Sequence, residues 1–409
     1  MTPLSSSRLG QAPRVCGPVS APGSCCLPVR PLQPLSMAGG DPPVCCGAEP
    51  APPASPHERP GYTLCAFVEG FVETPVGPVP RLAVGLTWLD RLGTVRARLG
   101  IARDRYRVAP GLYCVGEAGP DSPVLATANY KLSLDALRRE LGGRPAWILL
   151  LDTRGINVWC AAGKGTFGTE ELVRRVKSAR LDQVVRHRRI VLPQLAAPGV
   201  SAIQVRRGCG FEVAWGPIRA RDVGAYLDDP GRETPAMRRL TFTLAERLVL
   251  VPVEISLVLR PLLWTALGLL ILSGIGPDVF ALSRAWQRMW VGLAAVLAGV
   301  GAGALLVPAF LPWLPGRLFA AKGLLTGLLA GLGLLVPLSG GGAWSEGAAL
   351  VLVCSAISSY TAMTFTGATP FTSPSGVEWE MRRAIPLQVF MALAALCGWV
   401  AAPFLTRGG

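Results

Sequence analysis

Hydrophobic and polar positions divide the chain into three parts, and the last of them is the most regular. From residue 251 to residue 409, five hydrophobic stretches lie near 254–275, 289–310, 318–338, 346–366 and 384–405. Each stretch has the length of roughly 20 residues that a helix needs to cross the hydrocarbon core of a bilayer. Five such stretches in series are unlike the buried helices of a soluble protein. The pattern therefore predicts an all-α transmembrane domain of five helices.

Residues 61–250 alternate short apolar runs with amphipathic segments. Four runs have the composition of strands: Pro123–Thr127, Trp147–Asp152, Arg189–Leu192 and Gly210–Trp215. The pattern also predicts a helix over Leu134–Leu141 capped by Ser133, and a helix over Glu170–Ala179 capped by Thr169. Strands that alternate with helices predict an α/β domain with a mostly parallel sheet. In such sheets ligands bind beyond the carboxyl ends of the strands.

Residues 1–60 show no apolar periodicity and are rich in Pro, Ala, Gly, Ser and Cys, which predicts a disordered extension. They contain Cys16 and the pairs Cys25-Cys26 and Cys45-Cys46, and vicinal thiols can chelate a soft metal ion. The alternative is an extension without function, or one that is not translated if Met37 is the start. Residues 1–30 have no unbroken apolar core of the signal-peptide kind, so we expect reduced, cytoplasmic cysteines.

Composition and charge narrow the class of protein. Charged residues make up 16% of the chain, compared with about 25% in an ordinary soluble protein, which again indicates a membrane portion. The formal net charge is +14, but no basic run interleaved with aromatic residues indicates nucleic-acid binding. Attraction to an anionic cytoplasmic leaflet, worth about 1 kcal/mol per basic residue near the surface, accounts better for the excess.

Arginine placement gives an orientation. The arginines that precede or open the first and fifth stretches are Arg232, Arg238, Arg239, Arg247, Arg260, Arg382 and Arg383. They share one side of the membrane if residues 61–250 are cytoplasmic, as the positive-inside rule favours. Arg284 and Arg288 fall on the other side and count against it. Acidic residues of the membrane part (Glu254, Asp278, Glu346, Glu378, Glu380) lie near the ends of the stretches, which favours an anchor or docking platform over an ion path.

The segment Asn157–Gly168 carries the candidate chemistry. Its glycines Gly163, Gly165 and Gly168 fit the GxGxxG dinucleotide pattern, with Asp182 beyond them. That pattern should follow its strand directly, whereas here about ten residues intervene. A Walker A loop is excluded because no glycine stands five residues before Gly163. A second interpretation is that Cys160 is a structural cysteine, since free cysteines are often buried and inert.

The third interpretation is a resemblance. All eight residues from Asn157 to Lys164 (N-V-W-C-A-A-G-K) match the cap-helix motif of the mercury-methylating corrinoid proteins, the HgcA family. Further segments look familial: 86–93, 110–113, 122–125, 129–131, 192–195, 197–199 and 364–376. The resemblance covers roughly residues 61–405, and the family joins a corrinoid domain to five membrane spans. The α/β domain also resembles, more distantly, the large subunit of the corrinoid iron–sulfur protein of the acetyl-CoA pathway, which lacks the motif cysteine.

This resemblance implies a Rossmann-like domain that holds a corrinoid, a cobalamin-type cofactor with cobalt, and it implies that Cys160 is the lower axial ligand of the cobalt. The surrounding cofactor site would comprise Asn157, Val158, Trp159, Ala161, Ala162, Gly163, Lys164, Gly165 and Thr166. The residue types suit the task, because a thiolate is the metal-binding form of cysteine. The only two histidines, His57 and His187, lie outside the D-x-H-x-x-G motif that supplies histidine ligands in other corrinoid proteins.

Individual residues of the motif have expected roles. Asn157 can cap the short helix. Lys164 would lie on the same face as Cys160 if the helix persists, where its charge favours the thiolate; the alternatives are a solvated side chain or a contact to a corrin carboxamide. Small side chains at 161–163 would let a flat macrocycle approach the backbone.

The family's function is corrinoid-dependent methyl transfer from a methyltetrahydrofolate-type donor, delivered by a separate methyltransferase, to inorganic Hg(II). Its partner is a small ferredoxin with two [4Fe–4S] clusters (HgcB-type), and this chain has no C-x₂-C-x₂-C run for such clusters. The location implied is the inner (cytoplasmic) membrane, multi-pass, with the corrinoid domain in the cytoplasm. Two alternatives are a corrinoid methyl carrier for another acceptor in one-carbon metabolism and a five-span transporter or receptor with a nucleotide-binding domain. The segment Thr366–Glu380 is expected to be a polar cytoplasmic loop.

Overall fold

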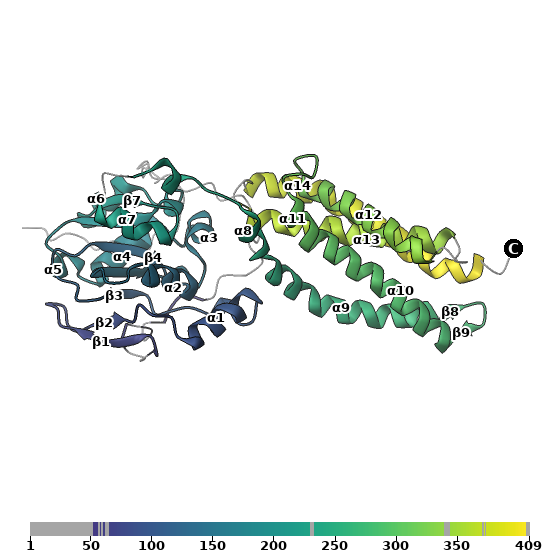
Figure 1. The fold of residues 1–409 in the computed structure, drawn as a ribbon, viewed down its shortest axis with the longest axis horizontal. Helices are drawn as coiled ribbons and strands as arrows, with labels where there is room; N and C mark the ends of the chain where they lie inside the picture. The colour runs from purple at the N-terminus through teal and green to yellow at the C-terminus, as the bar shows by residue number, and fades with distance from the viewer. Residues whose placement is uncertain are drawn as a thin grey trace, which may run out of the picture. The chain divides into compact units, whose positions relative to one another are not determined.

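The computed structural model describes residues 52–55, 58, 60–61, 65–229, 233–338, 344–369, 372 and 374–405. The expected extension over residues 1–60 lies almost wholly outside them, and so do Cys16 and both cysteine pairs. The described chain forms an α/β part, built around a seven-stranded sheet, and a part made of long helices (Figure 1).

The sheet contains β1 (Val68–Val72), β2 (Val79–Leu82), β3 (Gly111–Val115), β4 (Val124–Ala128), β5 (Ala146–Leu151), β6 (Arg189–Pro193) and β7 (Glu212–Gly216). The helices of this part are α1 (Trp88–Arg98), α2 (Lys131–Glu140), α3 (Val158–Gly163), α4 (Thr169–Ser178), α5 (Leu181–Val184), α6 (Ala202–Cys209) and α7 (Val223–Asp228). The four strands expected from the apolar runs are confirmed as β4 to β7. Strands β1 to β3 were not expected, because their runs are short and those of β1 and β2 are interrupted by Gly, Pro or Arg.

The strands lie in the order β1-β2-β3-β5-β4-β6-β7. Strands β1 and β2 pair antiparallel, as do β3 and β5, and the other four pairings are parallel, so the sheet is mixed but mostly parallel, as expected. From β5 to β7 all neighbours are parallel. In chain order these four strands run 2-1-3-4, which is the beginning of the flavodoxin-like doubly wound order, and the direction of winding reverses between β4 and β6. The strict Rossmann order 3-2-1-4-5-6 is not seen among the described strands.

Both faces of the sheet are covered, and β5 shows why. All six of its residues are buried. Because successive side chains of a strand point to opposite faces, Trp147, Leu149 and Leu151 join one core cluster, and Ile148 and Leu150 join the other. Helices α4 and α6 cover the first face through residues of the first cluster, and α2 and α7 cover the second face. A continuous apolar run is therefore what a central parallel strand requires.

Two expected helix starts are wrong by a few residues, and tertiary contacts explain both. Helix α2 begins at Lys131 after Tyr130 rather than after Ser133, because the side chain of Lys131 is drawn inward by buried carboxylates. Helix α4 begins at Thr169 itself, after Gly168. The Thr169 hydroxyl accepts a hydrogen bond from the Ser201 amide at 2.9 Å instead of capping its own helix.

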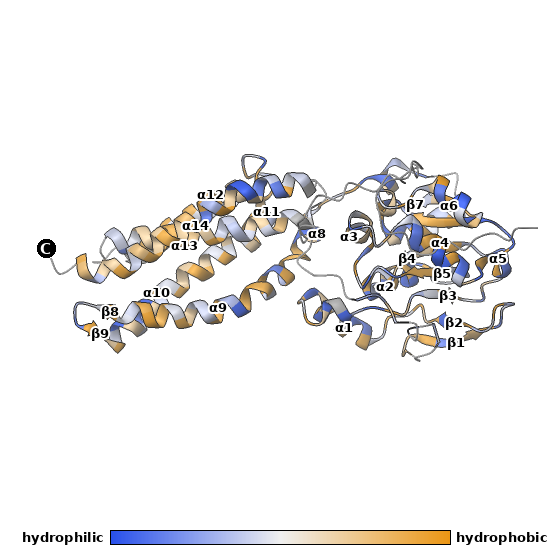
Figure 2. Ribbon diagram, turned by 180° about the vertical axis from the view of Figure 1, so that it is seen from behind, coloured by the Kyte–Doolittle hydropathy of each residue, from blue (hydrophilic) through white to orange (hydrophobic). Residues whose placement is uncertain are grey.

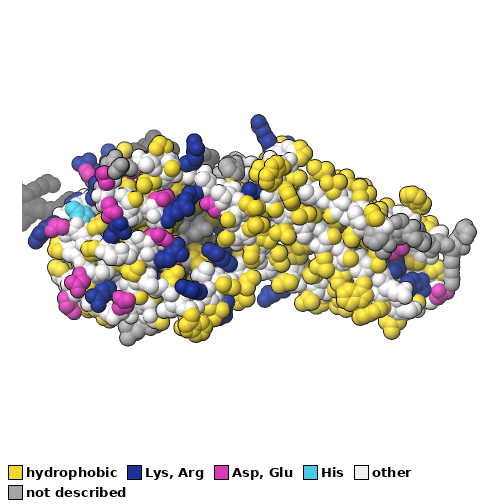
Figure 3. All heavy atoms as spheres, in the orientation of Figure 1, with side chains coloured by type: hydrophobic (Ala, Val, Ile, Leu, Met, Phe, Trp, Pro, Cys, Tyr) yellow, Lys and Arg dark blue, Asp and Glu magenta, His cyan; other side chains and the backbone are white. Residues whose placement is uncertain are grey.

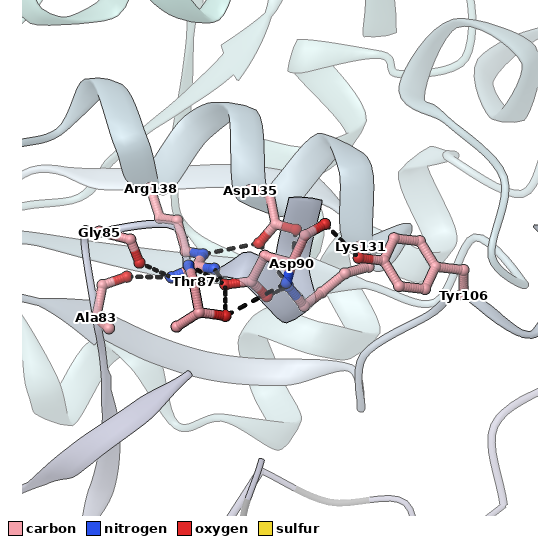
Figure 4. Close-up of polar contacts among 8 residues, drawn as sticks. All are labelled: Ala83, Gly85, Thr87, Asp90, Tyr106, Lys131, Asp135 and Arg138. Atoms are coloured by element: carbon pink, nitrogen blue, oxygen red, sulfur yellow. Dashed lines mark hydrogen bonds and ion pairs between the residues drawn. The ribbon is translucent and has the colours of Figure 1, made fainter. Parts of the chain in front are cut away.

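A buried network of four charges joins α1 to α2 (Figure 4). The ammonium of Lys131 lies 2.7 Å from Asp90 Oδ1 and 2.6 Å from Asp135 Oδ1. The guanidinium of Arg138 lies 2.8 Å from Asp90 Oδ2 and 2.7 Å from Asp135 Oδ1. All four side chains are buried. Thr87, the N-cap of α1, forms a capping box with Asp90, so the same carboxylate begins α1 and ties it to α2.

The ionisation of Asp90 is set by this network. Burial opposes its charge, but hydrogen bonds from Lys131 and Thr87 and the charge of Lys131 outweigh burial and hold the pKa of Asp90 well below its ordinary value. A carboxyl with a lowered folded-state pKa contributes stability that is fully present above its unfolded pKa of about 3.9. That contribution is lost as the pH falls through the lower folded-state pKa.

We predict that Asp90→Asn lowers the free energy of unfolding near neutral pH by about 3–5 kcal/mol, because the cations of the network lose a buried counter-charge. The difference from wild type should begin to shrink below about pH 4, where the carboxyl takes up a proton in the unfolded state while it is still ionised in the folded state. Denaturant unfolding of the purified chain across pH measures both effects. Asp121→Asn, in an exposed pair with Arg186, is the control and should leave stability unchanged. Equal losses in the two variants would contradict the prediction.

The helical part contains α8 (Leu244–Leu248), α9 (Val251–Gly274), α10 (Leu282–Gly301), a π-helical segment (Ala302–Leu306), α11 (Val307–Phe310), α12 (Phe319–Leu338), α13 (Trp344–Thr364) and α14 (Pro374–Leu405). A hairpin of β8 (Ile275–Gly276) and β9 (Val279–Phe280) connects α9 to α10. Five segments are long and apolar enough to span a membrane, as expected. Figure 2 shows their hydropathy, and Figure 3 shows mainly hydrophobic side chains over this part. The chain is therefore a membrane protein.

Gly323, Gly327 and Gly331 recur at spacing four along the third stretch, which predicts one helical face where another helix can approach closely, and the packing confirms it. A Cβ on Gly323 would lie 2.4 Å from the Ser358 carbonyl oxygen, and one on Gly331 would lie 2.9 Å from Val351 Cα. All three glycines, Gly327 included, face α13, so α12 and α13 approach closely. The expected loop Thr366–Glu380 is wrong in its second half, because α14 begins at Pro374.

Candidate functional site at the carboxyl edge of the sheet

A cavity of about 380 Å³ opens where the winding of the sheet reverses. It lies at the carboxyl ends of β4 and β6, the place where doubly wound sheets bind ligands. Its wall is mostly apolar and comprises Leu125, Ala126, Thr127, Ser133, Ala136, Leu137, Asn157, Val158, Trp159, Val191, Leu192, Pro193, Leu195, Gly216, Pro217, Ile218, Ala220 and Val223. Three residues of the motif, Asn157 to Trp159, therefore contribute directly to the cavity.

The motif forms a helix of its own, α3, directly after the loop that follows β5 (Figure 1). The side chain of Asn157 caps this helix by accepting a hydrogen bond from the Cys160 amide at 2.9 Å, as expected. Cys160 therefore occupies the third position of the helix, where the cap fixes its backbone. Its side chain is buried, with 6% exposed, and it is a thiol rather than part of a disulfide.

The loop between β5 and α3 is held by side chains from two other elements. Asn129, just after β4, accepts hydrogen bonds at its Oδ1 from the amides of Thr153 and Gly155 and from the Thr153 hydroxyl. Its amide nitrogen donates to Asp152 at 3.2 Å. From α4, Glu171 accepts the Asp152 amide at 2.8 Å. Because buried backbone groups need partners, these bonds give the loop one conformation and so position α3.

The underside of α3 packs on the core. Ala161 and Ala162 are buried, and a Cβ on Gly199 would lie 3.1 Å from Ala162 Cα and 2.3 Å from the Phe167 carbonyl oxygen. The glycine at 199 therefore allows its turn to approach the backbone of α3 at Ala162, a contact that the sequence did not predict. Gly163 is exposed at the end of the helix.

The remaining residues of the motif surround the end of α3. Lys164 follows the last helical residue, and its amide donates to the Cys160 carbonyl at 3.0 Å, so the helical path persists up to it. Gly165 has a φ of +77°, which an L side chain rarely adopts. The Thr166 hydroxyl donates to the Ala161 carbonyl at 3.4 Å. Because α3 stands between β5 and the glycines, they do not form the strand-to-helix turn of a dinucleotide site.

The Gln194 side-chain oxygen, directly after β6, is buried and has no hydrogen-bond partner among the described residues. The Tyr130 hydroxyl, directly after β4, is also buried, and its neighbour is the guanidinium of Arg103, within reach of a hydrogen bond. Burial raises the pKa of the Tyr130 phenol, nearby guanidinium groups of Arg103 and Arg98 lower it, and Cys160 raises it further. Unsatisfied buried polar atoms in a native protein call for a missing partner.

Histidine is absent from this edge in the part of the chain that the structure describes. His187 precedes β6 and contacts the Ser122 carbonyl just before β4, so it lies at the amino ends of the strands, opposite the cavity. His57 lies outside the described residues. No group of three or more His, Cys, Asp or Glu side chains among the described residues could hold a metal ion alone.

Sequence reasoning missed Asn129, Tyr130, Asp152, Glu171 and Gln194 as members of this edge. The segments 129–131 and 192–195 stood out only as familial stretches without assigned chemistry. Their position could have indicated a role, since both segments lie at the carboxyl end of a predicted strand, where such sheets bind ligands. The hydrogen bonds that give Asn129 its role join residues more than 20 positions apart, so they could not be read from local pattern.

The region of the chain that contains this edge is similar in sequence to known proteins. The family model described as CO dehydrogenase/acetyl-CoA synthase delta subunit matches residues 100–227. The gamma subunit of the acetyl-CoA decarbonylase/synthase complex of Archaeoglobus fulgidus is 30% identical over 140 residues, which are 33% of this chain and 29% of that protein. The corrinoid/iron-sulfur protein large subunit of Moorella thermoacetica is 30% identical over 127 residues, 29% of this chain and 27% of that protein.

The similarity has a defined extent. The gamma subunit of Methanopyrus kandleri is 28% identical over 131 residues, 32% of this chain and 28% of that protein. The chain thus spans less than a third of the length of these curated relatives. The matched residues 100–227 contain β3 to β7, α3 and the whole cavity wall. The α/β part is therefore related to subunits of this group over the region that builds the candidate site.

We predict that Asn129→Ala releases the loop before α3. Three donors lose their buried acceptor, so the free energy of unfolding should fall by about 1–3 kcal/mol. Backbone amides from residue 153 to residue 164 should exchange with deuterium faster than in wild type, as measured by mass spectrometry on the full chain. Ser178→Ala, which removes an exposed hydroxyl of α4, is the control and should change neither quantity. Unchanged exchange in the Asn129 variant would refute the role of its amide.

Proposed function

We propose that the chain is a corrinoid-dependent methyl carrier in which Cys160 is the lower axial ligand of cobalt. The observation that carries the proposal is the position of Cys160, which lies on a rigidly capped helix at the carboxyl edge of a doubly wound sheet. The relatives support the cofactor class, because one of them is named a corrinoid/iron-sulfur protein. The region that the family model matches, residues 100–227, includes Cys160.

The residues present fit such a cofactor. The apolar cavity beside Asn157, Val158 and Trp159 is large enough for one end of an extended cofactor, and its size lies within the usual range for small-molecule pockets. The unsatisfied side-chain oxygen of Gln194 offers a hydrogen bond to a bound group. The proposed site comprises Asn157, Val158, Trp159, Cys160, Ala161, Ala162, Gly163, Lys164, Gly165 and Thr166, the last four around the helix end.

The residues of the chain have distinct tasks in this proposal. When bound, the corrinoid supplies a cobalt that can accept and release a methyl group. Asn157 fixes the backbone of Cys160, so that its thiol would be held in place for a bound metal. A coordinating thiol loses its proton to become the ligand, and the charge of Lys164 at the end of α3 favours that form. Trp159 and Val158 keep water away through the apolar wall they contribute.

Inorganic Hg(II) is the methyl acceptor that we propose, and the product is methylmercury. The support is the match of Asn157–Lys164 to the cap-helix motif of the mercury-methylating family, together with five membrane helices after the α/β part. A methyltetrahydrofolate-dependent methyltransferase would supply the methyl group. A small ferredoxin with two [4Fe–4S] clusters would return the cobalt to its reduced state.

The proposed location is the inner (cytoplasmic) membrane, with a corrinoid domain over residues 61–250 in the cytoplasm and a membrane domain over residues 251–409. Arginines before the first and fifth helices support this orientation. Arg284 and Arg288, which count against it, both form ion pairs, with Asp278 at 3.4 Å and with Glu346 at 3.1 Å. Their positions are therefore explained by local packing at that end of the helices.

A methyl carrier for another acceptor of one-carbon metabolism is the second candidate function, and the relatives favour it, because they are named as subunits of acetyl-CoA complexes. One experiment separates the two. The full chain, purified without oxygen and loaded with corrinoid, receives a labelled methyl group and then Hg(II). Formation of labelled methylmercury supports the first function. A chain that binds corrinoid and accepts the label but gives no methylmercury supports the second, and a chain that binds no corrinoid refutes both.

We predict that Cys160→Ala abolishes methylation of Hg(II), because no other thiol stands at this position of α3. The variant should remain in the membrane fraction and unfold like wild type, since alanine keeps the helix. Methylmercury from cells that express each form measures the activity. Cys209→Ala, which changes a half-buried thiol on α6, is the control and should stay active. Normal activity of the Cys160 variant would remove the thiolate ligand from the mechanism.

We further predict that Cys160→His retains cobalt but transfers methyl to Hg(II) more slowly. Imidazole is a neutral and weaker electron donor than thiolate, so it should leave less negative charge on the opposite ligand. Visible spectra of the loaded variant report metal ligation, and labelled-methyl transfer reports the rate. A rate equal to that of wild type would show that the identity of the ligand does not matter.

A further inference from the structure

Helix α1 exposes a continuous apolar stripe. With about 100° of rotation per residue, Trp88, Leu92, Val95 and Leu99 fall within one narrow sector of the helix. Their side chains are 70%, 45%, 53% and 41% exposed. Scattered exposed apolar residues are ordinary, but four on one helical face form a contiguous patch that marks an interaction surface.

The polarity of α1 is the reverse of that of an ordinary surface helix. Its inward face carries Asp90, Gly93 and Ala97, and Asp90 is fixed there by the buried charges of Lys131 and Arg138 (Figure 4). A helix that buries a carboxylate and exposes its leucines is not held by its own hydrophobic stripe. The ion pairs fix the helix to the domain and leave the stripe directed outward. Figure 2 shows hydrophilic and hydrophobic positions side by side along α1.

Arginines border the stripe on both sides. By the same rotation, Arg96 lies beside one edge, and Arg91 and Arg98 lie beside the other. All three are exposed. From residue 88 to residue 107 the chain has six arginines and two aspartates, and one of these, Asp90, is already neutralised by its buried partners. An apolar stripe with Trp at its start and long cations along its borders is the composition of a helix that lies in a membrane interface.

We propose that α1 is an interfacial helix that docks the α/β part onto the surface of an anionic bilayer. The α/β part is tethered to the membrane, because the same chain continues into the membrane-spanning helices. Only residues 229–243 separate α7 from α8, and they span at most roughly 50 Å when extended. The stripe inserts among the lipid headgroups, and the arginines contact lipid phosphates, each worth about 1 kcal/mol near an anionic surface. The proposal does not depend on the cofactor or on the methyl acceptor.

The test follows Trp88 in the full chain, reconstituted as single copies in nanodiscs of phosphatidylcholine or of a mixture with phosphatidylglycerol. Hydroxyl-radical oxidation, resolved by peptide mass spectrometry, reports the exposure of each tryptophan. We expect Trp88 to be oxidised at least about three-fold more slowly in anionic nanodiscs than in detergent, with weaker protection in neutral lipid. High salt should reduce the difference between the two lipids, because screening weakens the contacts of the arginines.

Three variants make the result specific. The double variant Leu92→Glu with Val95→Glu should lose the protection of Trp88, and Arg91→Gln with Arg96→Gln and Arg98→Gln should lose the preference for anionic lipid. Ile203→Glu, on the exposed side of α6, is the matched control and should keep both. Trp147, which is buried in the sheet, reports in every variant that the domain is folded.

Other occupants of the stripe give other outcomes, and each overturns the proposal. Equal oxidation of Trp88 in detergent and in both lipids would show that no bilayer covers it. Protection in detergent that appears only at high protein concentration would indicate a second copy of the chain. Protection in detergent after addition of a cobalamin would place the cofactor on the stripe.

Discussion

The side-chain amide of Asn129 is the interaction on which the candidate site depends. It satisfies three donors of the loop between β5 and α3, and its own nitrogen donates to Asp152. Asn129 stands at the end of β4, one strand away from the loop it holds. A short helix such as α3 has little stability by itself, because nucleation is costly. Its position is therefore set by polar contacts at its start and by the close approach of Gly199 beneath it.

The two residues after Asn129 extend this arrangement in different directions. Tyr130 is buried at the same edge, and Lys131 enters the ion network that fixes α1. Three consecutive residues at the carboxyl end of β4 thus contribute to the loop before α3, to the buried edge and to the attachment of α1. Topology explains this, because β4 lies between β5 and β6, next to the switch point. A change in these three residues should therefore affect the candidate site and the attachment of α1 together.

Much of the architecture could be read from local pattern. The run Trp147–Asp152 predicted the central strand β5, because a strand buried on both faces is continuously apolar. The helix cap at Asn157 followed from residue type, and the five spans followed from length. The starts of α2 and α4 could not be read in this way, because the side chains of Lys131 and Thr169 contact residues far away in the sequence. Strands β1 to β3 were missed because their runs are too short to predict a strand without the pairing that neighbouring strands supply.

The sequence by itself determined the α/β and helical classes, the capped helix around Cys160 and the glycine face of α12, because each depends on residues a few positions apart. Only the tertiary structure decided the mixed sheet, the cavity between β4 and β6, and the placement of Tyr130 and Gln194 at one edge. It also decided that α1 turns its leucines outward, since the buried charges that force this orientation come from α2. Helix propensity and hydrophobic periodicity depend on residues a few positions apart and can be read from the sequence. The partner of a buried charge is decided only when segments distant in the sequence pack together.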